Sequence, residues 1–320
     1  MNRTALVGAT GFVGSTLQRQ CRFDALYNSR NIDTIAGQSF DRLVCAAAPA
    51  TMWAANQDPA ADKAKLTSLV GSLSSVKVGT FVLISTIAVL DDAAAGYTEA
   101  TARYETEKAY GRHRRELEEA IAARFERCRI LRLPALFGPG LKKNFVFDLL
   151  NPLPSFIRPD TFDTTRAAFS PADQTRLDTA YSFDEALGMW ALDRAALERS
   201  PEREPLTAAF AAIGFVARNF TNSASRFQYY NMARLAADID RAVEAELDLV
   251  HVCSEPVSAA EVVRELTGET FENAGPAVVN EDMQSIHADV YGGPAPYLIG
   301  RSEVLADLKA YYTAQAGAAA

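Results

Sequence analysis

Cysteine, histidine and tryptophan are scarce in this chain. Its 320 residues include only 4 cysteines, 3 histidines and 2 tryptophans. The cysteines are far apart in the sequence, so no two of them have the spacing of a metal-ligand pair or a redox motif. We therefore expect reduced thiols in a cytoplasmic protein, and no metal site, at Cys21, Cys45, Cys128 and Cys253.

Long apolar runs and an excess of positive charge are also lacking. No uninterrupted apolar stretch reaches the ~18 residues of a membrane-spanning helix. A strand is predicted to begin near residue 4, which leaves no room for a signal peptide. The 32 basic and 40 acidic residues give a net charge of −8, which argues against nucleic acid as the main partner. We therefore expect a cytoplasmic globular protein with neither a membrane nor a nucleic acid as its partner.

A glycine-rich segment at the start is the most informative feature that the chain has. Thr4–Val7 have strand character and run directly into Gly8-Ala9-Thr10-Gly11-Phe12-Val13-Gly14. In such a segment Gly8 would make a sharp turn, Gly11 would let a phosphate approach the backbone, and Gly14 would let the following helix pack on the strand. The free N–H groups at the helix start would face the phosphate. The segment predicts a dinucleotide-binding turn; a glycine-rich turn without a ligand is the alternative.

Strands and helices alternate through the first part of the chain. The predicted strands are apolar on both faces, and they lie near residues 4–7, 25–27, 41–47, 81–85 and 129–133. Helices are predicted near residues 12–20, 58–73 and 109–124. This alternation is typical of a parallel sheet covered by helices on both sides. We predict an α/β fold, a doubly wound Rossmann-type sheet with a smaller, mainly helical substrate lobe.

The alternation ends at Gly138-Pro139-Gly140. Residues from about 141 to 227 carry prolines, aromatics and helical pieces, which indicates a separate lobe. An amphipathic helix near 231–246 and a strand near 249–252 are expected to return to the sheet. The predicted dinucleotide-binding domain is therefore 1–140 with about 228–253, and the predicted substrate-binding lobe is about 141–227 with 254–320.

Two hydroxyl groups end the strand near residues 81–85. Ligands of an open parallel sheet bind at the carboxyl ends of its strands, so Ser85 and Thr86 are expected where a nucleotide and its substrate would meet. Either hydroxyl could hydrogen-bond a reacting carbonyl oxygen. Either could instead only satisfy the end of the strand.

A tyrosine and a cation follow on the next predicted helix. Tyr110 and Arg114 are four residues apart and share a helix face. A fixed cation lowers the pKa of a phenol, and such a tyrosine can exchange a proton with a substrate oxygen near neutral pH. His113 lies further round the helix and is expected to be exposed or capping.

Tyr104 and Lys108 form a rival pair with the same spacing. On a helix the two tyrosines would point about 120° apart, so only one could face a cofactor. We favour Tyr110 because of the residues around it, Gly111, Arg112 and Glu118.

Taken together, these segments resemble the extended branch of the short-chain dehydrogenase/reductase superfamily, the group of nucleotide-sugar epimerases and dehydratases. The resemblance covers most of the chain and rests on the glycine motif, Ile84-Ser85-Thr86, Tyr110-Gly111-Arg112-His113-Arg114 and the exit segment 132–140. It implies a nicotinamide cofactor across the glycine turn, with Tyr110 as general acid/base and Thr86 orienting the substrate oxygen. Arg114 takes the place of the family's lysine, which holds the ribose and tunes the tyrosine. The cofactor contacts outside the glycine motif would include Ala46, Ala47, Ser85 and Pro134.

Three positions depart from the family pattern. Arg114 replaces a lysine, and guanidinium is planar, larger and never neutral. Ile87-Ala88 follow the threonine where dehydratases have an Asp-Glu pair, which argues against sugar dehydration. Ala135 replaces an asparagine that is frequent in the exit strand, which weakens the case for a nucleotide-diphosphate sugar.

The end of the second strand bears on the choice of cofactor. An acidic residue there would bind the ribose 2′-hydroxyl of NAD and repel the 2′-phosphate of NADP. Asn28, Ser29 and Arg30 offer donors and a positive charge instead, which favours NADP. Asp33 would restore a preference for NAD if the strand ended later.

The leading hypothesis is an NADP-dependent oxidoreductase that reduces a keto-sugar or a related carbonyl, with Lys143 and Asn144 as candidate substrate contacts. One alternative is a sugar epimerase that works through a transient keto intermediate. Another is a non-catalytic NAD(P)-binding sensor or scaffold, for which the arginine at position 114 is the best argument. The resemblance also implies a homodimer through the helices at 110–124 and 58–73.

Overall fold

The computed structural model describes residues 3–319, which divide into two compact units. The first contains the residues up to Leu141, Arg226–Ser258 and Val279–Tyr311. The second contains Lys142–Ser225, Ala259–Val278 and the residues from Tyr312 onward. The segment Val279–Tyr311, which the sequence analysis placed in the substrate lobe, is thus part of the first unit. It is held there by contacts that local sequence cannot show, such as the bridge between Ser254 and Ile299.

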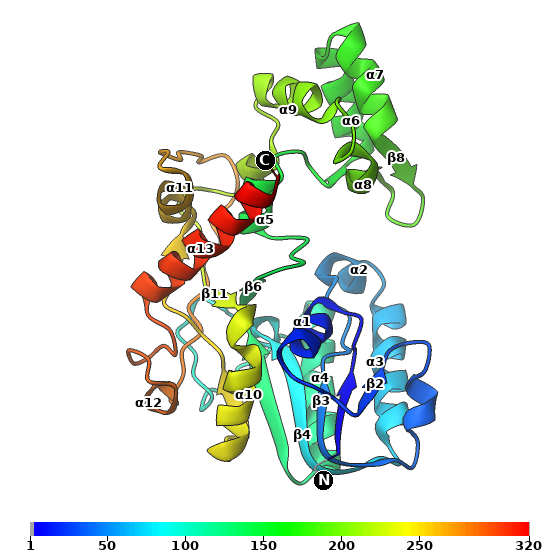
Figure 1. Ribbon diagram of the computed structural model, residues 1–320, viewed down its shortest axis with the longest axis vertical. Coiled ribbons are helices and arrows are strands. Elements are labelled where there is room, and N and C mark those ends of the chain that lie inside the picture. Colours follow the sequence, from blue (N-terminus) through cyan, green and yellow to red (C-terminus); the bar gives the residue numbers. More distant parts are fainter. Residues whose placement is uncertain (1–2, 320) are drawn as a thin grey trace. The chain divides into compact units, whose positions relative to one another are not determined.

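A six-stranded sheet forms the middle of the first unit (Figure 1). Its order is β12-β5-β4-β3-β1-β2, and all neighbours are parallel. The strands are β1 (Thr4–Val7), β2 (Ala25–Tyr27), β3 (Ser39–Cys45), β4 (Lys77–Thr86), β5 (Cys128–Leu133) and β12 (Leu249–His251). From β1 the order continues to β2 on one side and to β3 on the other. The predicted doubly wound α/β fold is confirmed, and its topological switch point lies between β1 and β3.

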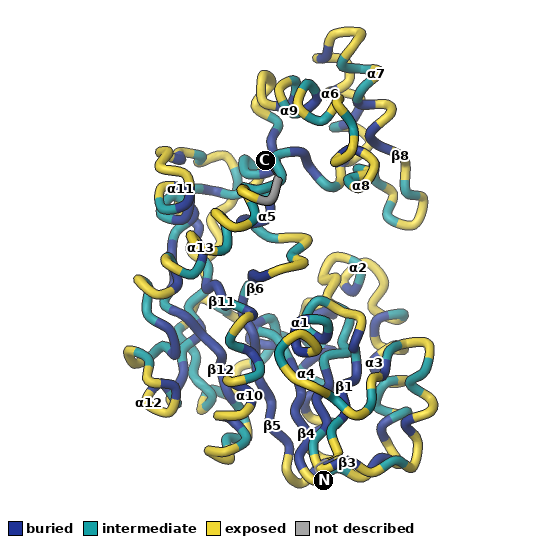
Figure 2. Tube along the Cα trace, viewed as in Figure 1, coloured by how far each residue is buried: buried dark blue, intermediate teal, exposed yellow. Residues whose placement is uncertain are grey.

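The helices of the first unit pack in pairs. α1 (Phe12–Gln20) lies beside α10 (Leu235–Glu244), and α3 (Pro59–Leu73) lies beside α4 (Ala109–Arg124). In Figure 1, α1 and α10 lie in front of the sheet and α4 lies behind it. The central strands are accordingly buried along most of their length (Figure 2). The predicted bounds of α1, α4 and β2 agree with the structure, whereas β3 and β4 begin earlier than their apolar runs.

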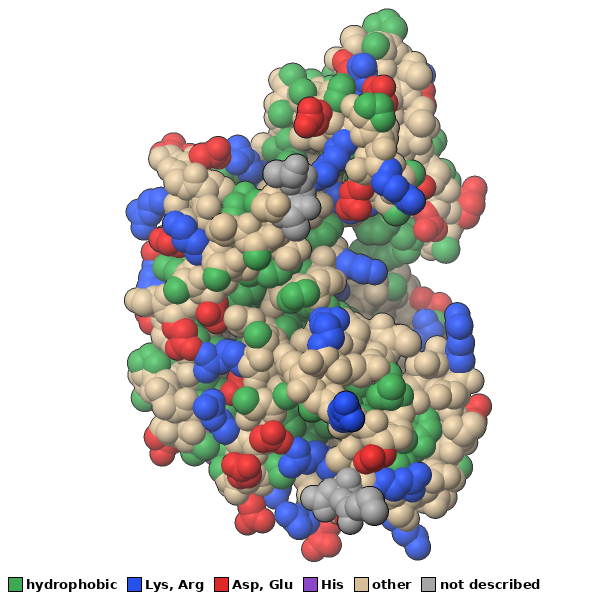
Figure 3. All heavy atoms as spheres, viewed as in Figure 1, with side chains coloured by type: hydrophobic (Ala, Val, Ile, Leu, Met, Phe, Trp, Pro, Cys, Tyr) green, Lys and Arg blue, Asp and Glu red, His purple; other side chains and the backbone are tan. Residues whose placement is uncertain are grey.

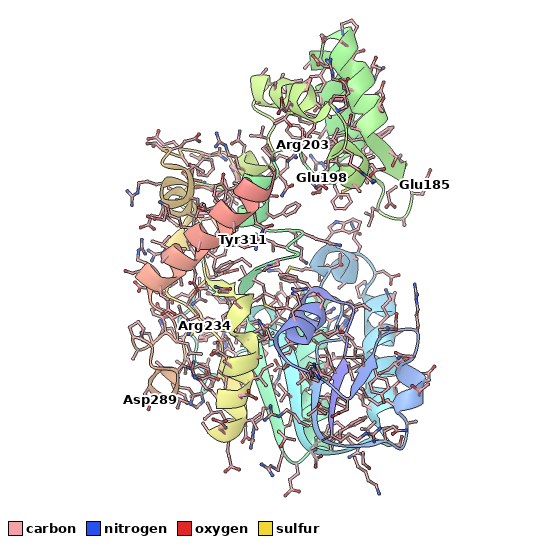
Figure 4. The ribbon with its side chains drawn as sticks, viewed as in Figure 1. Glu185, Glu198, Arg203, Arg234, Asp289 and Tyr311 are labelled. Carbon is pink, nitrogen blue, oxygen red and sulfur yellow. The ribbon has the colours of Figure 1, made fainter. Side chains whose placement is uncertain are left out.

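The later segments of the first unit attach beside the sheet. β6 (Ala135–Phe137) pairs in parallel with β11 (Tyr229–Asn231), and Phe137 packs against Tyr311 of α13 (Arg301–Ala319). Arg234, at the start of α10 in Figure 4, pairs with Glu303 of α13. The remaining elements are η1 (Ile32–Ile35), α2 (Met52–Gln57), η2 (Ile87–Val89), β10 (Arg226–Phe227), η4 (Met232–Arg234), β13 (Val257–Ser258) and α12 (Ala288–Tyr291).

The second unit is mainly helical, with a small antiparallel sheet of order β7-β9-β8 that the sequence pattern did not reveal. Its core is aromatic: Phe162 stacks on Trp190 with ring centroids 4.0 Å apart, and Phe169 packs edge-on against Phe210. The elements are α5 (Phe145–Leu150), β7 (Phe156–Ile157), α6 (Pro159–Ala168), α7 (Pro171–Ala180), β8 (Tyr181–Asp184), β9 (Met189–Leu192), α8 (Arg194–Leu197), α9 (Arg203–Ala212), η3 (Ala217–Phe220) and α11 (Ala259–Thr267).

Acidic and basic side chains are interspersed over the face of the molecule drawn in Figure 3. Between residues 3 and 319, none of the helices combines the length and the apolar character that crossing a bilayer requires.

Candidate active site

The glycine turn fits tightly at the switch point between β1 and β3. Gly8 has a φ of +88°, and its N–H donates to the carbonyl of Tyr27 at 2.9 Å. A Cβ at this position would lie 2.4 Å from the carbonyl oxygen of Ala46. Both the positive φ and the close approach therefore exclude any other residue at position 8. Ala46 and Ala47, two of the predicted cofactor contacts, directly follow β3 at this point.

The first turn of α1 presents open backbone donors. Gly11 is the N-cap with a φ of −74°, and no side chain caps the helix in the described part of the chain. The N–H groups of Phe12, Val13 and Gly14 therefore remain available to an anion, in the arrangement that binds phosphates at helix starts. A Cβ on Gly14 would lie 2.1 Å from the carbonyl oxygen of Gly8, so only glycine lets α1 sit directly on the turn. Thr10 is exposed beside them, and this cradle fits a pyrophosphate.

The loop after β2 uses two of its polar side chains to fold itself. The Oδ1 of Asn31 accepts from the backbone N–H of Asn28 at 2.7 Å, and the Oδ1 of Asn28 accepts from that of Arg30 at 2.9 Å. Ser29 and Arg30 are exposed. Asp33, the nearest carboxylate along the chain, lies within η1 rather than at the end of β2. The loop therefore presents a cation and a hydroxyl, and Asn28 contributes mainly to its shape.

The two hydroxyls at the end of β4 have different partners. Ser85 donates to the carboxylate of Glu118 in α4 at 2.6 Å, so its hydroxyl serves a buried contact. Thr86 accepts from the backbone N–H of Ala88 at 3.2 Å, and its hydroxyl also lowers the pKa of the Tyr110 phenol. Of the two, Thr86 is the one that lies beside the candidate acid/base.

A close helix contact brings Tyr110 to Thr86. A Cβ on Gly111 would lie 2.0 Å from the carbonyl oxygen of Ala88, so glycine at this position lets α4 rest on the backbone that follows Thr86. The N–H of Tyr110 donates to the Oδ1 of Asn56 in α2 at 2.9 Å. Asn56 was not found by sequence reasoning, since its partner is 54 positions away and no local pattern marks it.

The surroundings of Tyr110 correct one expectation. The tyrosine is only 9% exposed, and burial raises the pKa of its phenol above the ordinary value. The charge of Arg114 and the hydrogen bond with Thr86 lower this pKa, as the sequence analysis expected of the cation, and the charge of Asp62 raises it further. Because desolvation is the largest effect, the phenol stays protonated at neutral pH instead of approaching ionisation.

Arg114 is buried and bound to a carboxylate that the sequence analysis did not identify. Its Nη1 and Nη2 donate to the two oxygens of Asp62 in α3, at 2.6 and 2.9 Å. Nη2 also donates to the carbonyl of Pro49 at 2.6 Å, and the guanidinium carbon lies 3.9 Å from the ring centre of Tyr110. His113 binds the same carboxylate at 2.8 Å and is 3% exposed, so the expectation of an exposed or capping histidine was wrong.

Glu118 is the centre of a second buried group of charges on α4. Its carboxylate accepts from Arg132 of β5 at 3.0 and 2.6 Å, in addition to Ser85, and both charged residues are fully buried. The Nη1 of Arg132 also forms a hydrogen bond with the Nε2 of His251 in β12, at 3.1 Å. Three neighbouring strands and α4 are thereby joined at the carboxyl edge of the sheet.

The rival pair does not share a helix face. Tyr104 precedes α4 and forms an isolated bridge with Leu90, and Arg115 stacks on its ring at 3.9 Å. Lys108 is the N-cap of α4. Its side chain is exposed, and its Nζ lies 3.9 Å from the Oε2 of Glu105.

Three further residues were predicted as cofactor or substrate contacts. Pro134 is buried between β5 and β6. Lys143 and Asn144 belong to the second unit, where Lys143 is exposed and Asn144 caps α5 through the N–H of Phe147 at 3.1 Å.

The sequence was compared with protein families and with curated proteins. Residues 2–156 match a family model described as the RmlD substrate binding domain. This match covers the part of the chain that carries the glycine turn, Thr86 and Tyr110, and it agrees with the resemblance to the extended short-chain dehydrogenase/reductase superfamily. No curated protein matches its sequence.

Several solved structures share the fold of this chain at low identity. A dTDP-4-dehydrorhamnose reductase ortholog from Clostridium acetobutylicum is 14% identical, with a TM-score of 0.60 over 98% of this chain and 99% of the other. RMD from Pseudomonas aeruginosa, complexed with NADPH, is also 14% identical, with a TM-score of 0.61 over 99% and 100%. A UDP-glucuronic acid 4-epimerase variant from Bacillus cereus, in complex with NAD and a fluorinated substrate analogue, is 11% identical, with a TM-score of 0.61 over 99% of each chain.

Proposed function

We propose that this protein is an NADP-dependent reductase of a keto-sugar or a related small carbonyl compound, with Tyr110 as the general acid. The observation that carries this proposal is the buried phenol of Tyr110 beside the hydroxyl of Thr86, at the carboxyl edge of the sheet. Reduction of a carbonyl requires a proton donor at the oxygen. A tyrosine whose pKa is raised by burial is protonated at neutral pH and can supply that proton.

NADP is supported by the loop after β2 and by the similar structures. Arg30 is exposed there without a carboxylate on either side, which suits a 2′-phosphate. The structure of RMD contains NADPH, and that of a dTDP-4-dehydrorhamnose reductase from Bacillus anthracis contains NADP. The Bacillus cereus epimerase holds NAD, which is the alternative cofactor. The open N–H groups of α1 would hold the pyrophosphate of either one.

The residues of the chain have separate tasks in the proposed reaction. When bound, NADPH supplies a hydride for the carbonyl carbon. Tyr110 passes its phenolic proton to the carbonyl oxygen, and Thr86 hydrogen-bonds that oxygen so that it faces the phenol. The product is an alcohol. That Lys143 and Asn144 contact a phosphate of the substrate stays a prediction from the sequence.

The protonation of Tyr110 also separates reduction from the closest alternative. An epimerase that works through a ketone begins by removing a proton from an alcohol, and its tyrosine must therefore be ionised at the start. The burial of Tyr110 disfavours the ionised form. We infer a cytoplasmic protein that forms a homodimer through α3 and α4, and sedimentation of the full chain would test the dimer.

The experiment is a comparison of Tyr110→Phe with Tyr104→Phe. Tyr110→Phe should lower NADPH-dependent reduction by about 10²- to 10⁴-fold, the usual contribution of a general acid, and leave NADPH binding intact by fluorescence titration. Tyr104→Phe is the matched control and should retain most of the activity. Equal turnover in Tyr110→Phe and the unchanged protein would contradict the proposal. If neither NADPH nor NADH changed the fluorescence or the melting temperature, the cofactor would be excluded as well.

The pH dependence follows from the same phenol. A proton donor is active while protonated, and the pKa of Tyr110 is raised above its ordinary value of 10.0. The rate of reduction at saturating NADPH should therefore show no loss from Tyr110 between neutral pH and about 10, and it should fall above that. A fall that begins near pH 7 and vanishes in Tyr110→Phe would show a lowered pKa and overturn the assignment of Tyr110 as donor.

A further inference from the structure

We propose that Asp62 is a positioning residue, which holds the guanidinium of Arg114 against the ring of Tyr110, so that Arg114 orients the tyrosine instead of binding the ribose of the cofactor. This inference rests on the proposed function. It assigns a role to a carboxylate of α3 and changes the role that the resemblance implied for Arg114.

The first support is the geometry of the ion pair. Arg114 and Asp62 are 2% and 5% exposed, and the guanidinium contacts both carboxylate oxygens. A two-pronged pair of this kind fixes the plane of the guanidinium as well as its position. The guanidinium carbon lies 3.9 Å from the ring centre of Tyr110, within the range of a cation–π contact.

The second support is the use of the donor atoms. Nη1 and Nη2 donate to Asp62, and Nη2 also reaches the carbonyl of Pro49. Nε is buried and has no hydrogen-bond partner within the described residues. Nη1 also donates to the carbonyl oxygen of Tyr110 at 3.3 Å, so each terminal nitrogen already has two acceptors. A ribose hydroxyl could therefore be bound only by giving up one of these acceptors, and loss of Asp62 would leave a buried carboxylate short of its main partner. The geometry therefore opposes a shift of Arg114 toward a cofactor.

The third support is the identity of the residue at position 114. A lysine has a single ammonium group on a flexible stem and lacks the planar fork that binds both oxygens of Asp62 and still contacts the phenol ring. Arginine satisfies both demands at once. The departure from the family's lysine and the presence of Asp62 on α3 thus have one common explanation.

Few charged groups face Tyr110, which makes the arrangement testable by titration. Arg114 comes from its own helix and lowers the pKa of the phenol, whereas Asp62 comes from α3 and raises it by a smaller amount. Thr86 of β4 contributes a hydrogen bond, and His113 reaches this site only through Asp62. Removing the charge of Asp62 alone would lower the pKa of Tyr110. Losing the contact with Arg114 as well would raise it.

The deciding experiment is an ultraviolet absorbance titration of Asp62→Asn, with the titration of Asp62→Asn/Tyr110→Phe subtracted to isolate Tyr110. If Asp62 holds Arg114 in place, the guanidinium leaves the ring and the pKa of Tyr110 rises. If Arg114 stays without Asp62, the pKa falls, and the proposal is wrong. Arg114→Met shows the effect of complete loss and should also raise the pKa. Because this readout needs neither turnover nor cofactor, it stands even if the protein is not a reductase.

Kinetics provide the second readout. Asp62→Asn should lower kcat about tenfold or more while the Kd for NADPH stays within about threefold, since the tyrosine loses its orientation and the cofactor loses no contact. Glu116→Gln is the matched control, because Glu116 pairs with Lys63 across the same two helices at the exposed surface. It should leave both constants unchanged. If Asp62→Asn weakened NADPH binding and left kcat unchanged, Arg114 would be a ribose contact, and the proposal would be wrong.

Discussion

The glycine turn and helix α4 belong to one candidate site but are built in opposite ways. The turn consists of backbone and small residues, and its shape follows from positions where no Cβ fits, such as Gly8 and Gly14. Helix α4 contributes to two buried groups of charges, one around Asp62 of α3 and one around its own Glu118. The glycines of the turn lie close together in sequence, even though Gly8 also packs against Ala46, whereas the charged partners of α4 are brought to it only by the fold.

This difference predicts different kinds of damage. A substitution in the turn introduces atoms where there is no space, and its cost is steric. A substitution among the charges of α4 leaves a partner buried without compensation, and its cost is electrostatic. The predictions below compare the two, beginning with the largest effect.

Glu118→Gln should be the most damaging. Glu118 and Arg132 are both fully buried, and loss of the carboxylate charge leaves Arg132 in the interior without a counterion. Breaking a buried pair in this way costs about 3–5 kcal/mol. Urea unfolding should show a loss of that size. Glu119→Gln is the control, since Glu119 is 59% exposed and its pair with Arg115 is worth no more than about 1 kcal/mol. Equal losses in the two variants would refute the electrostatic account of α4.

The same contrast explains what the sequence could predict. The glycine turn, the order of strands and helices and the positions of Thr86 and Tyr110 are encoded locally, through glycine spacing, apolar runs and helix periodicity. The sequence analysis chose Arg114 for its spacing from Tyr110, which was right, but did not identify the buried carboxylate that Arg114 binds. Its partner Asp62 lies 52 positions earlier, and nothing in the local sequence distinguishes a buried acid on a helix from an exposed one.

The pKa of Tyr110 could not be predicted for a related reason. A cation four residues away lowers the pKa of a phenol, and that contact is present in the structure. Burial has the larger and opposite effect, and burial depends on how α4 packs against β4 and α3. The second unit shows the same limit, because its small antiparallel sheet left no alternation in the sequence. Periodicity indicates which faces are apolar, and packing decides how deep each polar group lies.

Gly14→Ala should have the next largest effect and tests the steric side of the comparison. The new Cβ would lie 2.1 Å from the carbonyl oxygen of Gly8, so either the helix or the turn must move. We expect a loss of about 3 kcal/mol in stability, at the upper end for overpacking, together with loss of NADPH binding. Thermal unfolding and fluorescence titration would measure the two effects. Undisturbed NADPH affinity would show that the turn does not hold the pyrophosphate.

Arg30→Ala should have a smaller effect, confined to one cofactor. A charged hydrogen bond to the 2′-phosphate is worth about 1.5–3 kcal/mol, so the Kd for NADPH should rise about tenfold or more. The Kd for NADH should not change, because NADH lacks that phosphate. Arg22→Ala, at another exposed arginine, should leave both constants as they are. A parallel loss for NADPH and NADH would indicate that Arg30 only shapes the loop after β2.

Gly71→Ala should have the smallest effect, and it should be of opposite sign. Gly71 lies inside α3, and a Cβ built there meets no atom within 4 Å. Alanine is preferred to glycine in a helix interior by about 1 kcal/mol, because glycine loses more backbone freedom on folding. The variant should therefore be more stable than the unchanged protein in urea, while Gly14→Ala is less stable. Both positions are helical glycines, so the difference in sign measures the contact with the turn and not helix propensity. If both variants lost stability to the same extent, the tight packing of α1 on Gly8 would not be what requires glycine at position 14.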